Sequence, residues 1–485
     1  MDFINLPVTP QFPALLLSEL FGSNFTGDYS AELNKIAKYY SVYIKGASFP
    51  AEGSNGDYRP ADLHYKMSAS LIDREARFLF AQCPDITAVF DGDEKTEELS
   101  ENIDKLNKLL RKVLEQAHFE ANLLKAARDC FIGKRIAILV NFADDGEIAL
   151  SFLPSLNFAY LQREGELVKF LGFYPVMQPE GTAEKYCFYC KYYEAENGVI
   201  YVSEYKTNLS GMVLEETLPR QKTLLNAIPA VIVTNSGLCL DEKGKSEISD
   251  LLNYEFWYSL LANGDIDAER KSMNPVKFVV DMAANSTKNL SSAAGAFWDL
   301  GSDQNLEHAK TQVGLLEPGM HYSATLNRTL ERVQTAAYSA IDMPNTNLES
   351  LQGVITSGKA LKAIYWPLIV RCREKMQTWR PALRLLADTI IRGAVAYPAC
   401  ISYYLGPNEF VYAVDYKIDV VENLPLPEDE AEEKQLDLAE VNAEVMSRKA
   451  YMQKWRLLSE NEAERELMQI ARERQILENA TFKET

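Results

Sequence analysis

Residues 246–273, SEISDLLNYEFWYSLLANGDIDAERKSM, and residues 320–341, MHYSATLNRTLERVQTAAYSAI, decide the fold. Both carry apolar side chains at steps of three and four, the spacing that places them on one face of a helix. Between them, residues 275–319 contain short apolar runs, such as Val276–Val280, separated by Ser-, Asn- and Gly-rich segments. The sequence therefore predicts an outgoing helix, a small β-rich module and a returning helix, which together form a stalk with a tip.

A loop and a second, longer helix are predicted after the stalk. Residues 343–356 contain Pro, Asn and Gly and lack a periodic apolar pattern. Residues 357–391 then show apolar side chains at helical spacing. Pro367 and Pro381 lie inside this helix, and we expect them to kink it because proline removes a backbone donor and clashes with the preceding turn.

The rest of the chain mixes helices and strands. Residues 1–245 are predicted to form helices and then antiparallel strands joined by turns such as Asn197-Gly198. The predicted helices are 31–40, 64–80 and 97–130, and the predicted strands are 136–140, 148–153, 167–174, 186–193, 199–205 and 230–234. After the long helix we expect a strand at 410–420 and polar C-terminal helices within 428–485. The fold class is α+β.

The composition limits the possible partners. The chain has 485 residues, 47% of them apolar and 25% charged, and a net charge of −19. This length favours two to four structural units. Proteins hold nucleic acid by neutralising phosphates with Lys and Arg, so this charge excludes a broad DNA-gripping surface. Neither a signal sequence nor a membrane span of about 18 or more apolar residues is present, so we expect folding in the cytosol and no membrane partner.

No combination of residues is typical of a catalytic, cofactor or metal site. Cys187 and Cys190 lie in an alternating aromatic segment, for which we favour a structural strand over a redox or metal site. Gly244-Lys245-Ser246 lacks the earlier glycine of a phosphate-binding loop, so we predict a loop and a helix N-cap. The histidines are isolated from one another: His64, His118, His308 and His321. We therefore predict that the protein is not an enzyme and has no cofactor.

Several stretches follow one another in an order that has a counterpart in a known family. They are the helix at 64–81 followed by Cys83-Pro84, the strand at 228–233 followed by the helix at 246–262, the segment ITSGKALKAIY at 355–365, and the helices at 446–455 and 459–466. In this order the chain resembles the portal proteins of tailed bacteriophages, in the branch typical of phages that infect Gram-positive hosts. It departs from many relatives at Pro344–Gly353, which lacks their "FGGN"-like run.

The resemblance implies a portal fold with a wing, a helical stem, a small β-rich clip, a tunnel loop, a long kinked helix and a helical crown. The implied boundaries are 1–245 for the wing, 246–274 for the outgoing stem helix, 275–319 for the clip, 320–342 for the return stem helix, 343–356 for the tunnel loop, 357–427 for the long helix and returning wing strand, and 428–485 for the crown.

The resemblance also implies a function. The protein would form a dodecameric ring at one vertex of the capsid, assembled in the host cytoplasm and retained in the virion. Double-stranded DNA would pass through its channel during packaging and ejection without sequence specificity. Terminase, a head–tail connector or adaptor protein, scaffold and the major capsid protein would be its partners. Two alternatives stay open: a phage-encoded nucleic-acid-processing enzyme, and an assembly scaffold without a channel.

A net charge of −19 is compatible with a conduit, because an acidic wall does not retain DNA and a few basic residues suffice to centre it. We expect DNA contact at the tunnel loop and the helix start that follows it. The residues expected there are Asn345, Asn347, Gln352, Lys359 and Lys362. For the two lysines a solvated helix end is the alternative. The helix faces that bear Leu252, Phe256, Leu326 and Leu330 are expected to pack helix against helix within the ring.

Overall fold

The chain forms two compact units, the first comprising Met1–Asn345 and Pro367–Leu424 and the second comprising Thr346–Trp366 and Pro425–Thr485. The computed structural model describes residues 11–47, 60–91, 97–178, 186–235, 239, 243–273, 276–280, 312–316, 321–345, 358–407, 409, 415–423, 430–456, 458 and 460–481.

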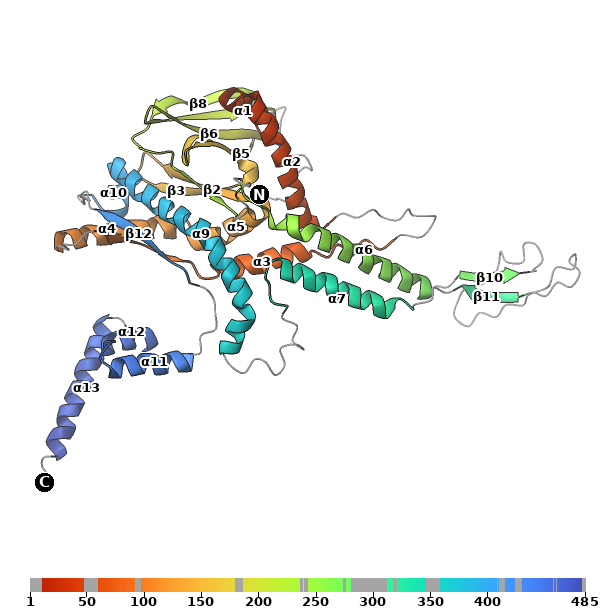
Figure 1. Cartoon of the computed structure of the whole chain (residues 1–485). Helices are drawn as coiled ribbons and strands as arrows, with labels where there is room; N and C mark the ends of the chain where they lie inside the picture. Colours follow the sequence, from red (N-terminus) through yellow and green to blue (C-terminus); the bar gives the residue numbers. More distant parts are fainter. Residues whose placement is uncertain are drawn as a thin grey trace, which may run out of the picture. The chain divides into compact units, whose positions relative to one another are not determined.

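Helices open the first unit (Figure 1). They are α1 (Ala14–Phe21), α2 (Ser23–Lys45), α3 (Met67–Phe80), α4 (Glu97–Gln116) and α5 (Phe119–Gly133). The helix predicted at 31–40 lies within α2. The single helix predicted at 97–130 is wrong, because the chain is interrupted at His118, whose φ of 46° is left-handed. The helix predicted from residue 64 begins at Met67 instead.

Two antiparallel sheets follow, with strand orders β3-β2-β9 and β4-β5-β6-β7-β8. Their strands are β2 (Arg135–Phe142), β3 (Ile148–Pro154), β4 (Phe158–Arg163), β5 (Glu166–Met177), β6 (Tyr186–Glu196), β7 (Val199–Thr207), β8 (Val213–Lys222) and β9 (Ala230–Thr234). The turn predicted between β6 and β7 is confirmed. Asn197 and Gly198 have φ values of 52° and 76°, as a two-residue hairpin turn with positive φ at both positions requires. The sequence did not predict β4 and β8.

The core of this region lies on both sides of the five-stranded sheet. Helices α1 and α2 cover one face, where Leu17 and Leu33 pack against Leu171 and Phe173. A second cluster joins the two sheets, with Leu139 of β2 among its members. The strand predicted around Cys187 and Cys190 is confirmed as β6, and both thiols are buried.

The predicted outgoing helix is α6 (Glu247–Met273), and the returning helix is α7 (Ser323–Ala340). The antiparallel strands β10 (Val276–Val280) and β11 (Gln312–Leu316) lie between them in the chain. Helices α6 and α7 run side by side in contact (Figure 1). The side chains of Leu252, Phe256, Leu326 and Leu330 are each half-buried. Most of the predicted clip, residues 281–311, lies outside the described residues.

The long helix α9 (Gly358–Ala396) contains both Pro367 and Pro381 and is followed by α10 (Pro398–Leu405). The boundary between the two compact units falls inside α9, at Trp366 and Pro367. No single helix of the described part is both long and apolar enough to cross a membrane; α9 from Lys362 onward passes that test only together with α10, at a bend of 104°.

The strand predicted at 410–420 is observed as β12 (Tyr416–Val421), and residues 410–414 lie outside the described part. It pairs antiparallel with β1 (Asp85–Phe90), a strand that the sequence did not predict.

In the second unit, the predicted polar C-terminal helices are α11 (Glu430–Asn442), α12 (Arg448–Arg456) and α13 (Glu460–Thr481). The Trp455 indole donates a hydrogen bond to the Asp437 carboxylate at 2.8 Å, which ties α12 to α11. Helices α12 and α13 pack against each other, and Met452 of α12 and Ala463 of α13 are buried.

Candidate functional site

Helix α6 begins with a fixed cap. The Ser246 hydroxyl accepts a hydrogen bond from the Ile248 amide at 3.2 Å and donates one to the Ile132 carbonyl at 2.6 Å. The Lys245 amine is paired with Asp250 at 2.7 Å. These contacts confirm the loop and N-cap predicted for this stretch, because the hydroxyl satisfies an otherwise unpaired amide of the first helical turn.

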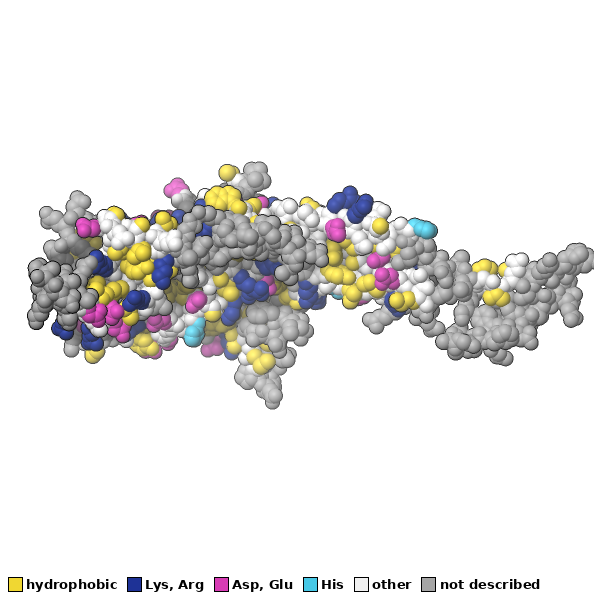
Figure 2. Space-filling model, turned by 90° about the horizontal axis from the view of Figure 1, so that it is seen from below, with side chains coloured by type: hydrophobic (Ala, Val, Ile, Leu, Met, Phe, Trp, Pro, Cys, Tyr) yellow, Lys and Arg dark blue, Asp and Glu magenta, His cyan; other side chains and the backbone are white. Residues whose placement is uncertain are grey.

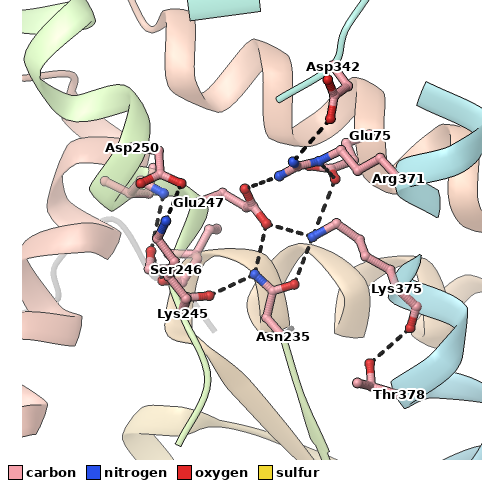
Figure 3. A network of polar contacts seen from close by, with 12 residues as sticks. Glu75, Asn235, Lys245, Ser246, Glu247, Asp250, Asp342, Arg371, Lys375 and Thr378 are labelled. Carbon is pink, nitrogen blue, oxygen red and sulfur yellow. Dashed lines mark hydrogen bonds and ion pairs between the residues drawn. The ribbon is translucent and has the colours of Figure 1, made fainter. Parts of the chain in front are cut away.

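A buried charge cluster lies beside this cap (Figure 3). It consists of Glu75 of α3, Glu247 of α6, and Arg371 and Lys375 of α9. Arg371 lies 2.8 Å from Glu75 and 2.5 Å from Glu247, and Lys375 lies 3.3 Å and 2.6 Å from the same two carboxylates. Each cation therefore bridges both anions, and three helices that are far apart in the sequence are joined at one point.

The cluster extends to the neighbouring elements through Asn235 and Asp342. The Asn235 side chain, just past β9, donates to Glu247 at 2.9 Å and accepts from Lys375 at 2.7 Å. Asp342 follows α7 and lies 3.8 Å from Arg371. The start of α6, the segment after α7 and the middle of α9 thus belong to one network of ion pairs and hydrogen bonds.

The two carboxylates of the charge cluster respond differently to their surroundings. Burial opposes ionisation of Glu247, but Lys375 and Arg371 outweigh it and lower the pKa of this group to about 2. For Glu75, burial prevails over the same two cations and raises the pKa above its usual range. On the cations, burial is outweighed by Glu247 and Glu75, so the pKa of Arg371 and that of Lys375 are both raised.

A second polar contact runs along α6, where Glu255, Asn263 and Asp267 are buried on one face. Asn263 and Asp267 hold the N-terminal strap, which we define as residues 60–66. The Asn263 amide donates to the Leu63 carbonyl and accepts from its N–H, both at 2.8 Å, and Asp267 accepts from the Ala61 N–H at 2.9 Å. The strap has no regular secondary structure of its own, so these side chains supply the partners that its backbone requires.

Glu255 binds the backbone on both sides of the strap. Its carboxylate accepts from the Ala47 N–H at 2.8 Å and from the Ser68 N–H at 2.7 Å. The second of these bonds caps the start of α3, where a carboxylate also complements the helix dipole. Glu255 therefore fastens both α2 and α3 to the outgoing helix.

Sequence reasoning missed both polar groups. A signal was present, because Glu255, Ser259, Asn263 and Asp267 recur every four residues and so form a polar row along one face of the helix. Likewise, Arg371 and Lys375 are four residues apart next to the apolar stripe of α9. Such a row of polar residues on the buried side of a helix indicates partners from another element, although it does not identify them.

The residues predicted to contact DNA are described only in part. Asn345 is exposed at the end of the segment after α7, and Lys362 is exposed near the start of α9. The two belong to different compact units. Asn347, Gln352 and the side chain of Lys359 lie outside the described residues. The DNA-contact site stays a prediction.

Charge is mixed on one face of the described surface. Figure 2 shows Lys and Arg side chains interspersed with acidic and apolar ones on the face seen from below, rather than in one continuous basic area over the described residues. Within the described part, no group of three or more His, Cys, Asp or Glu side chains is arranged to hold a metal ion.

Comparison with known proteins finds a similarity for part of the chain. Residues 308–476, about a third of the length, match the family model described as "Phage portal protein, SPP1 Gp6-like". No curated protein sequence matches the chain. Among solved structures, a chain from "Neck of empty GTA particle computed with C6 symmetry" is similar at a TM-score of 0.40 and 12% identity, over 78% of this chain and 86% of that chain; at these values the likeness is too low to bear on function. Residues 308–476 of this chain are thus similar to the phage portal family.

Proposed function

We propose that this chain is the subunit of a portal ring at one vertex of a phage capsid. In this proposal it forms a dodecamer around a channel through which double-stranded DNA is packaged and later ejected. The observation that carries the proposal is the portal-family match, which includes the returning helix α7, the long helix α9 and the C-terminal helices. The helix–hairpin–helix order of α6, β10, β11 and α7 supports it, since such a protruding pair suits a repeated ring element.

The charge of the chain supports a channel that does not retain DNA. A net charge of −19 gives a protein of this kind little general affinity for phosphates. We propose that the channel wall is acidic and that basic residues at the start of α9 centre the duplex. Lys362, which is exposed, and Lys359 are the candidates, together with Asn345, Asn347 and Gln352 of the tunnel loop.

Further partners follow from the same proposal. The ring would dock terminase during packaging and a head–tail connector afterwards, and would contact scaffold and the major capsid protein during head assembly. We place its assembly in the cytoplasm of a Gram-positive host and its final position in the virion. An enzymatic role is not part of the proposal.

Electron microscopy of the purified full-length chain tests the ring. Negative-stain images are expected to show rings with a central hole, and class averages give the subunit number. A protein that stays monomeric at high concentration and in the presence of scaffold contradicts the proposal. Rings without a hole would favour a scaffold, and nuclease or ATPase activity that a single substitution abolishes would favour an enzyme.

A deletion tests the tunnel loop separately. Removing Pro344–Gly353 is expected to leave ring assembly intact and to impair DNA packaging. Lys362→Ala is expected to reduce packaging as well, whereas Lys38→Ala, which changes an exposed lysine of α2, serves as the matched control. Loss of rings on deletion would show that the segment belongs to the subunit interface instead.

A further inference from the structure

The two carboxylates of the charge cluster are not equivalent in their hydrogen bonds. Glu247 uses both oxygens: Oε1 accepts from Lys375 and Asn235, and Oε2 accepts from Arg371. In Glu75, Oε1 lies near both cations, but Oε2 is buried and has no hydrogen-bond donor among the described residues. Figure 3 shows Glu75 on the α3 side of the cluster.

A buried carboxylate oxygen without a hydrogen-bond donor destabilises the folded state. Removing a polar atom from water without a hydrogen-bond partner costs about 1–3 kcal/mol, and more for a charged group. Glu75 is fully buried in the middle of α3. The charged form of Glu75 is therefore poorly accommodated, although its other oxygen is well paired. Oε2 is the atom at which a proton would relieve that cost.

The local charge balance tolerates such a proton. Two carboxylates face two cations, so neutral Glu75 leaves one excess positive charge. Asp342 lies 3.8 Å from Arg371 and its side chain is half exposed, so it offsets part of this excess. Glu247 retains direct contacts to both Arg371 and Lys375 in either state of Glu75.

The ionisable groups that face Glu75 are few. From α9 they are Arg371, Lys375 and Cys372, and from α6 Glu247. Burial raises the pKa of the Cys372 thiol to about 12, so this group stays neutral.

Helices α2 and α5 also pack on α3, and each places one polar side chain on Asp73 rather than on Glu75. Cys130 of α5 faces Lys375 and Glu247, and burial raises the pKa of its thiol to about 12, so it stays neutral. Tyr43 of α2 donates to Asp73 at 2.7 Å, and Arg128 of α5 lies 3.0 Å from it. Titration of Glu75 is therefore governed by the cluster itself.

We propose that Glu75 is a pH-dependent contact between α3 and α9. When Glu75 takes up one proton, the packing of the two helices tightens; when it loses that proton, the packing loosens, while Glu247 keeps α6 attached to α9. The device is independent of any assembly of the chain. It assigns the two similar carboxylates opposite roles, one as a permanent anion and one as an adjustable contact.

The direction of this pH dependence follows from the linkage between proton binding and packing. Burial raises the pKa of Glu75 above its ordinary value of 4.5, in spite of Lys375 and Arg371. The packed state therefore binds the proton more tightly than a solvated Glu75 does. Its stabilising contribution is fully present below pH 4.5 and is lost as the pH rises through the raised pKa. Glu247, with a pKa of about 2, stays charged throughout this window.

Hydrogen–deuterium exchange of the full-length chain between pH 5.5 and 8.5, corrected for intrinsic exchange rates, tests the proposal. In the wild type, protection of α3 peptides is expected to fall as the pH rises, by at most about tenfold for each pH unit. Glu75→Gln is expected to show high α3 protection at every pH and to lose this dependence. Glu247→Gln is expected to lose protection in the first turns of α6 at every pH.

Asp129 of α5 is the necessary control, because burial raises the pKa of its carboxyl to about 6. Asp129→Asn is expected to keep the part of the α3 pH dependence that Glu75 causes. If Glu75→Gln does not fold, or protects α3 less than the wild type at pH 8.5, the negative charge is required and the proposal is wrong. Equal pH dependence in the wild type and Glu75→Gln also refutes it.

Discussion

Glu247→Gln is the substitution that tests the charge cluster most directly. The change keeps the shape of the side chain and removes its charge. Arg371 and Lys375, which are 2.5 Å and 2.6 Å from the carboxylate, then share Glu75 alone. Breaking a buried ion pair by removing one partner costs about 3–5 kcal/mol, because a buried charge is left uncompensated.

The lowered pKa of Glu247 gives a stabilisation of similar size. The cations lower the pKa of Glu247 from 4.5 to about 2, against the effect of burial. Each pKa unit corresponds to about 1.4 kcal/mol, so the charged form contributes roughly 3 kcal/mol at neutral pH. For a unit as large as the first one, this loss lowers the melting temperature by roughly 3–4 °C.

Differential scanning calorimetry at pH 7 measures the effect, with circular dichroism to verify that the variant is folded. Glu269→Gln, an exposed position on the same helix, is the matched control and is expected to change stability by less than about 0.5 kcal/mol. If the two variants melt within 1 °C of each other, the cluster does not stabilise the fold and the reasoning fails.

Three further outcomes are expected. Asn263→Ala removes both bonds to Leu63 and is expected to make the strap cleavable by a nonspecific protease at low dose; unchanged cleavage would mean that other contacts hold it. Gly244→Ala places a Cβ 2.5 Å from a backbone carbonyl oxygen at a φ of +78° and is expected to cost more than about 1 kcal/mol, measured by urea unfolding; a neutral result would show that the loop can shift. At Glu32, burial raises the pKa, but Arg135 outweighs it and the pKa falls to about 2, so its contribution is present above pH 4.5 and is lost as the pH falls toward 2; Glu32→Gln should flatten an acid titration followed by circular dichroism there.

Local signals predicted much of the fold. The N-cap at Ser246 and the Asn197-Gly198 turn depend on residues next to them in the sequence, and both were found correctly. The helix and strand order of the stalk follows from periodicity alone. The break at His118 was missed, because a histidine in a left-handed conformation gives no compositional signal within an apolar helical pattern.

The polar contacts between segments far apart in the chain could not be predicted from the sequence. Apolar periodicity gave no indication that Glu255 and Asn263 are among the most buried side chains of α6. Their partners lie about 200 residues away in the chain, and nothing in either segment specifies the pairing. The same holds for Glu75 in the charge cluster.

The strap has a consequence for the order in which the chain folds. Glu255 joins two amides that flank the strap and precede Glu255 by 208 and 187 residues, and Asn263 joins a strap amide that precedes it by 200. During synthesis the strap therefore leaves the ribosome long before α6 exists to receive it, and its amides stay bound to water until then. Contacts this far apart in sequence slow folding. The N-terminal helices can reach their final attachment only after the ribosome has translated beyond residue 267.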